Sequence, residues 1–197
     1  MNLKVRPKKV DMGKIKDPIL KAYMFAQEKH KGQTRKFSGK PYFVHPNAVA
    51  DLVDKYTKDP TLKVAAYLHD TLEDTKTTYQ DLSVLFSKHI ANLVKELTSV
   101  DSDLKKVGKA QYLTNKMNKM SKDALTIKLC DRLDNISGGM SRSFKEKYTK
   151  ETEHIINNLK RPLTGVHKKI IKDIQKRLVI LKKELGSRGA TDSASGS

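Results

Sequence analysis

The chain has 197 residues, of which 37% are hydrophobic, and a domain of this size can bury about 70% of the surface that its unfolded chain exposes. Its formal net charge of +18 at pH 7 is typical of a protein that binds polyanions, or of a lysine-rich solvated surface. A single cysteine, Cys130, excludes an internal disulfide, and no stretch approaches the roughly 20 apolar residues of a membrane span. The first residues lack the apolar segment of a secretory signal, so we expect a cytoplasmic protein.

The apolar residues follow a helical period in the N-terminal half, which predicts an all-α fold. Asp17-Pro18 is an N-cap followed by proline at the first helical position, and Gly32 provides a stop signal. A loop is expected over residues 33–45, which contain glycine and proline. The expected helices are 18–31, 46–57, one that opens at 60 and ends within 65–75, and one or two over 77–97.

The C-terminal half continues the helical pattern, for a total of roughly eight to ten helices. Residues 103–120 are basic and only weakly periodic. A buried helix is expected over 122–136, ending at Gly138-Gly139, and two long amphipathic helices over 143–160 and 163–184. We expect one domain over residues 1–185 and a small, polar, disordered tail over 186–197.

The positive charge comes mainly from lysines that are spread along the whole chain. Few aromatic side chains are interleaved with them, whereas surfaces that bind single-stranded nucleic acid combine positive charge with aromatic stacking platforms. We therefore expect a solvated lysine-rich surface and no specific nucleic-acid partner. The sequence leaves the oligomeric state open.

The segment AAYLHDTLEDT, residues 65–75, places His69, Asp70, Glu73 and Asp74 directly after an apolar run. In a helix, positions three and four apart share a face, so the first two side chains can point the same way as the last two. Carboxylates packed this closely repel one another, and a divalent cation reverses the sign of that interaction. Imidazole and carboxylate donors suit manganese, iron or zinc better than calcium.

Two further residues, His45 and Asp131, could complete such a site. Asp131 follows Leu129 and Cys130 in a segment apolar enough to be core, where a carboxylate needs a metal or a charged partner. Each residue also has an ordinary structural interpretation: His45 as a helix N-terminal residue, His69 as a hydrogen-bonded core histidine, and Asp131 as an ion-pair partner of Arg132. Their joint occurrence in this order is far more specific than any one of them.

Three segments, GQTRKFSGKPYFVHPNAVA, AAYLHDTLEDT and LTIKLCDRLDN, resemble the HD superfamily of metal-dependent phosphohydrolases. Within it they are similar to the hydrolase domain of the RelA/SpoT family, and the short chain is most similar to the small single-domain alarmone hydrolases. The resemblance covers roughly residues 23–181. It implies an all-helical HD-domain bundle with one Mn²⁺, or another divalent transition metal, that removes the 3′-pyrophosphate from (p)ppGpp to give GDP or GTP and pyrophosphate.

The resemblance also implies roles for individual residues. The metal ligands are His45, His69, Asp70 and Asp131, and the catalytic acidic pair is Glu73 and Asp74. The substrate-binding residues are Arg35, Lys36, Asn135 and Tyr148. Lys109 is a further candidate because its charge could reach a phosphate, and not because it matches the family pattern. Two positions depart from the family pattern: Gly138 replaces a threonine of the long relatives, and Phe144 and Lys145 stand where the small relatives have an arginine before the tyrosine.

Two other functions remain open at this stage. One is an NADPH 2′-phosphatase or another HD nucleotide phosphohydrolase, which need not have Arg35, Lys36 and Asn135 together. The other is a nucleic-acid-binding or regulatory module that retains the HD scaffold. Such a module would not need both a complete ligand set and the acidic pair.

Overall fold

In a computed structural model, residues 11–36, 38–100 and 105–187 are described. Helices are the only extended regular elements among them, and one isolated bridge joins Thr34 to Pro41. The all-α prediction is confirmed. The bounds are η1 Met12–Lys14, α1 Pro18–Lys29, α2 Val44–Thr57, α3 Pro60–Leu68, α4 Thr71–Asp74, α5 Tyr79–Leu85, α6 Lys88–Leu97, α8 Lys109–Lys119, α9 Lys122–Ser137, α10 Arg142–Asn157 and α11 Gly165–Gly186.

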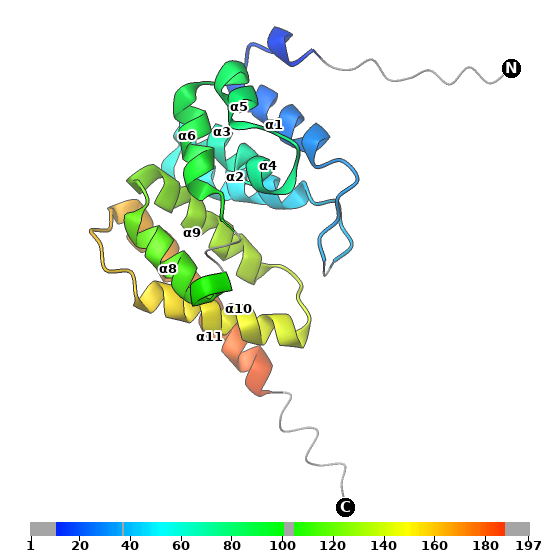
Figure 1. The fold of residues 1–197 in the computed structure, drawn as a ribbon. Coiled ribbons are helices and arrows are strands. Elements are labelled where there is room, and N and C mark those ends of the chain that lie inside the picture. The colour runs from blue at the N-terminus through cyan, green and yellow to red at the C-terminus, as the bar shows by residue number, and fades with distance from the viewer. Residues whose placement is uncertain (1–10, 37, 101–104, 188–197) are drawn as a thin grey trace, which may run out of the picture.

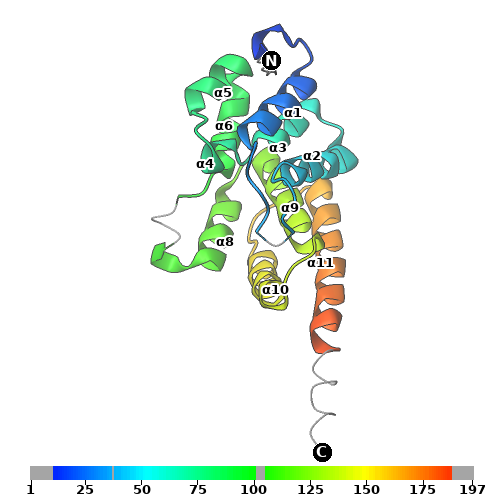
Figure 2. The same ribbon diagram turned by 90° about the vertical axis from the view of Figure 1, so that its right-hand side faces the viewer.

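Helix α9 occupies the centre of the molecule. Helices α1 to α6 gather on one side of it, and α8, α10 and α11 lie on the other (Figures 1 and 2). α9 packs against α2, α3 and α6 from the first group and against α10 and α11 from the second. Fully buried Leu129 on α9, Leu68 on α3 and Ile174 on α11 belong to one continuous core. A polar residue on α9 can therefore meet residues from both groups.

The helix boundaries follow from local side-chain chemistry. Asp17 accepts hydrogen bonds from the backbone N–H of Ile19 at 2.9 Å, and Asp59 accepts one from Thr61 at 2.8 Å, each ahead of a proline at the first helical position. Such caps satisfy backbone donors that the helix itself leaves unpaired. α2 ends at Thr57, and the next residue, Lys58, caps it with a left-handed φ of 57°. These starts agree with the sequence prediction.

The helix predicted to open at residue 60 ends within 65–75 as expected, and the helical backbone is interrupted at His69 and Asp70. α3 ends at Leu68, and the four-residue helix α4 starts at Thr71. The reason is that side chains occupy the last carbonyls of α3: His69 Nδ1 bonds to Ala66 O at 2.8 Å, and Thr71 Oγ1 donates to Leu68 O at 2.7 Å. The helical spacing assumed for residues 69–74 is therefore interrupted, although Asp74 N still donates to Asp70 O at 2.9 Å.

Most of the remaining elements differ from the prediction only at their ends, but helix α8 lies in a basic, weakly periodic stretch for which no helix was predicted. Residues 77–97 form two helices, α5 and α6, and a turn at Phe86 separates them. α11 extends to Gly186, which lies one residue inside the predicted tail, while residues 188–197 and Asp103 fall outside the described part. None of the helices in the described ranges is long and apolar enough to cross a membrane.

Candidate metal and active site

Three buried residues from three helices meet at the middle of α9. His45 lies in the first turn of α2, His69 follows α3, and Asp131 lies in the middle of α9. One donor atom from each lies within 4.8 Å of the other two. Asp131 Oδ1 is 3.2 Å from His45 Nε2 and 4.0 Å from His69 Nε2. This arrangement could hold a metal ion.

Both imidazoles are anchored through Nδ1, which leaves Nε2 directed at the cluster. His69 Nδ1 bonds to Ala66 O at 2.8 Å, and His45 Nδ1 bonds to Asp134 Oδ2 at 2.6 Å. Metal-binding histidines usually make such a bond with the nitrogen that does not face the ion. His69 Nε2 is buried without a hydrogen-bond partner among the described residues. A buried polar atom of this kind needs an explanation, and a cation provides one.

Asp70, the fourth predicted ligand, borders the same cluster. Its Oδ1 lies 3.2 Å from His69 Nε2, and its Oδ2 lies 3.7 Å from His45 Nε2. The hydroxyl of Tyr42 donates to Asp70 Oδ2 at 2.6 Å, which fixes the orientation of the carboxylate. All four predicted ligands are therefore brought together, and the residues present fit a metal with mixed nitrogen and oxygen donors.

The buried carboxylates are neutralised by neighbouring cations. Lys128 Nζ lies 2.8 Å from Asp131 Oδ2. Burial alone would raise the pKa of Asp131, but Lys128, His45 and His69 hold it well below its usual range. Burial likewise opposes protonation of His45, yet Asp131, Asp134 and Asp70 raise its pKa to about 9. Without a metal, protonated imidazole thus balances the negative charge that a divalent cation would balance.

The predicted alternative, an ion pair between Asp131 and Arg132, is not formed. Arg132 Nη1 instead bonds to Glu151 Oε1 at 2.6 Å, and both side chains are buried. Adjacent residues on a helix point in different directions, whereas Lys128, one turn before Asp131, shares its face. Asp131 is therefore ion-paired and also available to the cluster.

Glu73 and Asp74 lie on α4, one turn after the ligand pair, and both are exposed. Glu73 Oε2 accepts a hydrogen bond from Ser99 N at 2.7 Å. Desolvation, reinforced by the charges of Asp70 and Glu73, raises the pKa of Asp74. The backbone carbonyl of Asp74 accepts a 2.7 Å bond from Gln33 Nε2, which ties α4 to the loop after α1. The acidic pair thus stands at the solvent edge of the cluster.

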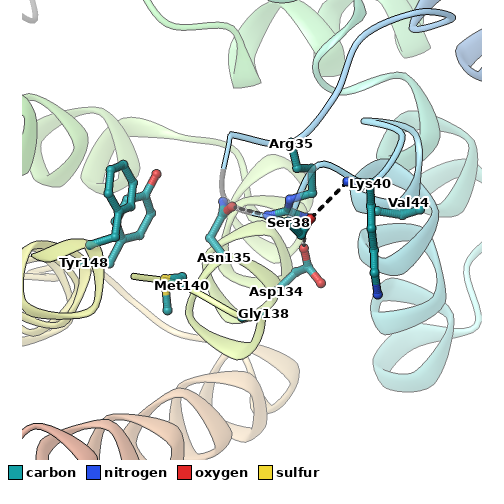
Figure 3. A pocket seen from close by; sticks show the side chains of 11 residues that line it. Arg35, Ser38, Lys40, Val44, Asp134, Asn135, Gly138, Met140 and Tyr148 are labelled. Carbon is teal, nitrogen blue, oxygen red and sulfur yellow. Dashed lines mark hydrogen bonds and ion pairs between the residues drawn. The ribbon is translucent and has the colours of Figure 1, made fainter. Parts of the chain in front are cut away.

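A cavity of about 230 Å³ adjoins the cluster. Figure 3 shows Arg35 directed towards Asp134 and Asn135 on one wall and Tyr148 on the opposite wall. Arg35 donates to Asp134 Oδ2 at 2.9 Å and to Asn135 Oδ1 at 3.2 Å. The lining residues are Arg35, Ser38, Lys40, Val44, Asp134, Asn135, Gly138, Gly139, Met140, Phe144 and Tyr148.

Three of the five predicted substrate-binding residues line this cavity, and two do not. Lys36 is exposed beside Arg35. Lys109 is not a lining residue, although its Nζ lies 5.4 Å from the ring centroid of Tyr148. At the two positions that depart from the family pattern, Gly138 and Phe144 line the cavity, and the Phe144 ring stacks on Tyr148 at 5.2 Å. Lys145 pairs with Glu184 at 2.6 Å and is not a lining residue.

Three residues of the site were not identified from the sequence: Asp134, Lys128 and Tyr42. Asp134 links His45 to Arg35, since its Oδ2 bonds to both. The signal for Asp134 and Lys128 was their spacing, because each lies three residues from Asp131 on a single helix and so shares its face. Tyr42 had no such signal, since it lies in the loop before α2.

Replacing Asp134 with alanine is expected to weaken metal binding about 10- to 100-fold, because His45 loses the acceptor that orients its imidazole. Calorimetric titration of the metal-free protein with Mn²⁺ measures this directly. Arg35→Ala is the matched control, since it removes the other partner of Asp134 and leaves the bond to His45. Equal affinity in Asp134→Ala and the unaltered protein would contradict a role for Asp134 in holding His45.

Comparison with known proteins agrees with this geometry. The model of the HD domain family matches residues 22–164. The chain belongs to the HD domain family. The matched range of this HD domain contains both histidines and both aspartates of the candidate metal site, as well as the acidic pair.

Named relatives of this HD domain are enzymes of guanosine tetraphosphate metabolism. The bifunctional (p)ppGpp synthase/hydrolase SpoT of Escherichia coli K12 is 36% identical over 156 residues, which cover 76% of this chain and 22% of SpoT. A guanosine-3′,5′-bis(diphosphate) 3′-pyrophosphohydrolase of Spiroplasma citri is 42% identical over 123 residues, which cover 60% of this chain and 16% of the Spiroplasma enzyme. The chain thus spans about a fifth of the length of these relatives.

A solved structure resembles most of this HD domain. It is that of a metazoan ortholog of SpoT that hydrolyses ppGpp, with a TM-score of 0.68 and 26% sequence identity. The alignment covers 81% of this chain and 95% of the metazoan one. Nearly all of the solved metazoan chain therefore corresponds to most of this HD domain.

Proposed function

We propose that this HD domain removes the 3′-pyrophosphate of (p)ppGpp, giving GDP or GTP and pyrophosphate. The observation that carries the proposal is the cavity lined by Arg35 and Asn135 beside the His–His–Asp cluster. A nucleotide in this cavity would present a phosphate group to the cluster. The activities of the named relatives support the same reaction, and we propose that residues 1–185 form one hydrolase domain.

The proposed metal ligands are His45, His69, Asp70 and Asp131. We propose Mn²⁺ because the donors are nitrogen and oxygen, and the one cysteine among the described residues, Cys130, is a buried neighbour of Asp131 outside the donor cluster. A bound ion of this kind lowers the pKa of a coordinated water and stabilises charge on a phosphoryl oxygen. The orphaned His69 Nε2 supports this use of the cluster.

We assign the handling of water and protons to Glu73 and Asp74. A carboxylate at the solvent edge can accept a hydrogen bond from the attacking water and take its proton as the new oxygen–phosphorus bond forms. The bond from phosphorus to the ribose 3′ oxygen breaks, and that oxygen must receive a proton. Asp74 suits this second role, because its raised pKa makes the protonated form more accessible than for an ordinary aspartate.

The remaining residues bind the nucleotide. The guanidinium of Arg35 is oriented by Asp134 and Asn135, so its free N–H groups can meet phosphate oxygens. Asn135 also donates to Asp131 Oδ1 at 2.6 Å, which connects nucleotide and metal sites. Tyr148, stacked on Phe144, offers an aromatic face. We propose that Lys36 and Lys109 are outer charges that attract the anionic substrate. We also propose that the protein is located in the cytoplasm, which is consistent with the buried free thiol of Cys130.

Product analysis tests the proposal. The protein is incubated with Mn²⁺ and, separately, with ppGpp, NADPH and plain nucleoside phosphates, and the products are separated by anion exchange. We expect pyrophosphate and GDP from ppGpp at the highest kcat/KM. Release of inorganic phosphate from NADPH at a higher kcat/KM would replace the proposal with a 2′-phosphatase, and inactivity on all of them would reject both.

Substrate binding is expected to weaken with salt. A ppGpp-like anion is steered by Arg35, Lys36 and nearby lysines, and salt shortens the range of that attraction. We expect KM to rise with ionic strength while kcat changes less, and Arg35→Ala to raise KM about 10-fold or more, as loss of a charge-assisted phosphate contact of ~1.5–3 kcal/mol implies.

The control for this prediction is neutralisation of Lys182 and Lys183 near the end of α11, which should leave KM unchanged. If these distant lysines matter as much as Arg35, and if DNA binds tightly at about 0.2 M salt, the charge serves nucleic acid instead.

A further inference from the structure

One peptide group lies between Glu73 and a lysine of α8. The segment 98–100 follows α6, and the peptide that joins Thr98 to Ser99 uses both of its polar atoms. Its N–H donates to Glu73 Oε2 at 2.7 Å, and its carbonyl oxygen accepts a hydrogen bond from Lys116 Nζ. Lys116 and Glu73 are thus joined through a single planar unit, although they are 43 positions apart in sequence.

The same segment has a second attachment to α8. The backbone N–H of Val100 donates to the hydroxyl of Tyr112 at 2.9 Å. Tyr112 lies one turn before Lys116, and Lys116 Nζ is 5.9 Å from the centre of its ring. Since Tyr112 and Lys116 share one face of α8, the helix holds the segment at residues 98 and 100, on either side of the N–H that meets Glu73.

We propose that Lys116, assisted by Tyr112, is a positioning residue that holds Glu73 in place through the Thr98–Ser99 peptide. This inference rests on the proposed function of Glu73. Glu73 lies on a four-residue helix and its side chain is exposed, so α4 alone does little to fix the carboxylate. A cation at the carbonyl oxygen polarises the peptide and strengthens its N–H as a donor, and a rigid supporting contact improves the alignment of a reacting group.

The surroundings of Lys116 make this contact sensitive to pH. Burial and the charge of Lys128 on α9 lower the pKa of Lys116 to about 8, against the opposing fields of Glu73 on α4 and Glu96 on α6. Lys116 is therefore charged below pH 8 and loses its charge as pH rises through that value. A neutral amine is a weaker hydrogen-bond donor, so the support of Glu73 should weaken above pH 8.

The test compares Lys116→Met, Tyr112→Phe and Lys116→Arg with Lys119→Met, an exposed lysine on the same helix. We expect Lys116→Met to lower kcat about 10-fold with little change in KM, a smaller loss than the ~10²-fold expected for a missing acid or base. Tyr112→Phe should lower kcat several-fold, and Lys119→Met should change neither constant. In the unaltered protein, kcat should fall above pH 8 as Lys116 loses its charge. Arginine keeps its charge at this pH, so in Lys116→Arg the fall in kcat should occur at higher pH.

A double-mutant cycle with Glu73→Gln separates positioning from general stability. If Lys116 acts through Glu73, Lys116→Met should cost little further activity once Glu73 is replaced. The proposal would be overturned if Lys116→Met lowers kcat equally in the unaltered protein and in Glu73→Gln. It would also be overturned if the fall in kcat above pH 8 is unchanged in Lys116→Arg. Tyr112→Phe keeps the test decisive if Lys116→Met fails to fold.

A readout without substrate keeps this inference distinct from the proposed function. The amide ¹H and ¹⁵N resonances of Ser99 should move in Lys116→Met and in Glu73→Gln, but not in Lys119→Met. An unaltered Ser99 amide in Lys116→Met would reject the link between Lys116 and Glu73. If the protein is inactive on ppGpp but the Ser99 amide moves as expected, the proposed reaction fails and the link stands.

Discussion

Removal of divalent metal is expected to abolish hydrolysis of ppGpp while leaving the helical fold in place. The predicted ligands are held by contacts within the protein: His45 by Asp134, His69 by Ala66 O, and Asp131 by Lys128. Chelation therefore removes the ion without removing the supports of its ligands. Activity assays and far-UV circular dichroism after dialysis against EDTA measure the two effects separately.

Adding back single metals provides the control for this experiment. Mn²⁺ should restore activity, and Ca²⁺ should not, because the donor set combines imidazole with carboxylate and Ca²⁺ prefers oxygen ligands alone. A bound ion should also raise the unfolding temperature in a concentration-dependent way. Full activity in protein shown by elemental analysis to be metal-free would reject the metal site.

Replacing Glu73 with glutamine is expected to lower kcat by ~10²-fold or more, which is the usual scale for a positioned acid or base. Glutamine keeps the size of the side chain and can still accept the hydrogen bond from Ser99 N, so the loss reports on the missing carboxylate. Metal content and nucleotide affinity should stay unchanged. Steady-state kinetics, elemental analysis and equilibrium binding of ppGpp measure the three quantities.

The matched control is Glu28→Gln, an exposed glutamate on α1 whose surface pair with Lys31 is 3.9 Å long. It should leave kcat unchanged, because exposed ion pairs of this length contribute little. If Glu73→Gln loses metal in proportion to activity, Glu73 is a metal ligand. The assignment of Glu73 and Asp74 to water and protons, apart from the metal ligands, would then be wrong.

The fold was largely predictable because its signals are local. Asp17 and Asp59 each cap a helix that begins with proline, and apolar residues recur with helical spacing. The break at His69 and Asp70 was not predictable in this way. It depends on His69 and Thr71 bonding to carbonyls of α3, and a helical pattern gives no sign that side chains will take those acceptors.

The candidate site also has parts that local sequence signals predicted and parts that they did not. The six predicted ligand and acidic residues occur in recognisable motifs, and the structure places the four ligands together. The supports of His69 and Asp131 are local, but that of His45 is a long-range contact: Asp134 lies 89 positions from His45 and 99 from its other partner, Arg35. Such pairs are set by the packing of α9 against α2 and the preceding loop. Spacing in one sequence indicates which residues share a helix face, but not which helix that face meets.

The contacts that anchor Nδ1 of both histidines affect when the protein can take up its proposed metal ion. Because His45 and His69 are oriented by Asp134 and Ala66 O, the donors are already arranged when the chain has folded. Folding and ion uptake are then separate events, unlike in zinc fingers, where the ion drives folding. The ion can be exchanged in the mature protein, so the supply of each metal at a given time would decide which one occupies the site. With Mn²⁺ as the proposed ion, a fall in available manganese would stop the proposed reaction reversibly, with no need for degradation or new synthesis.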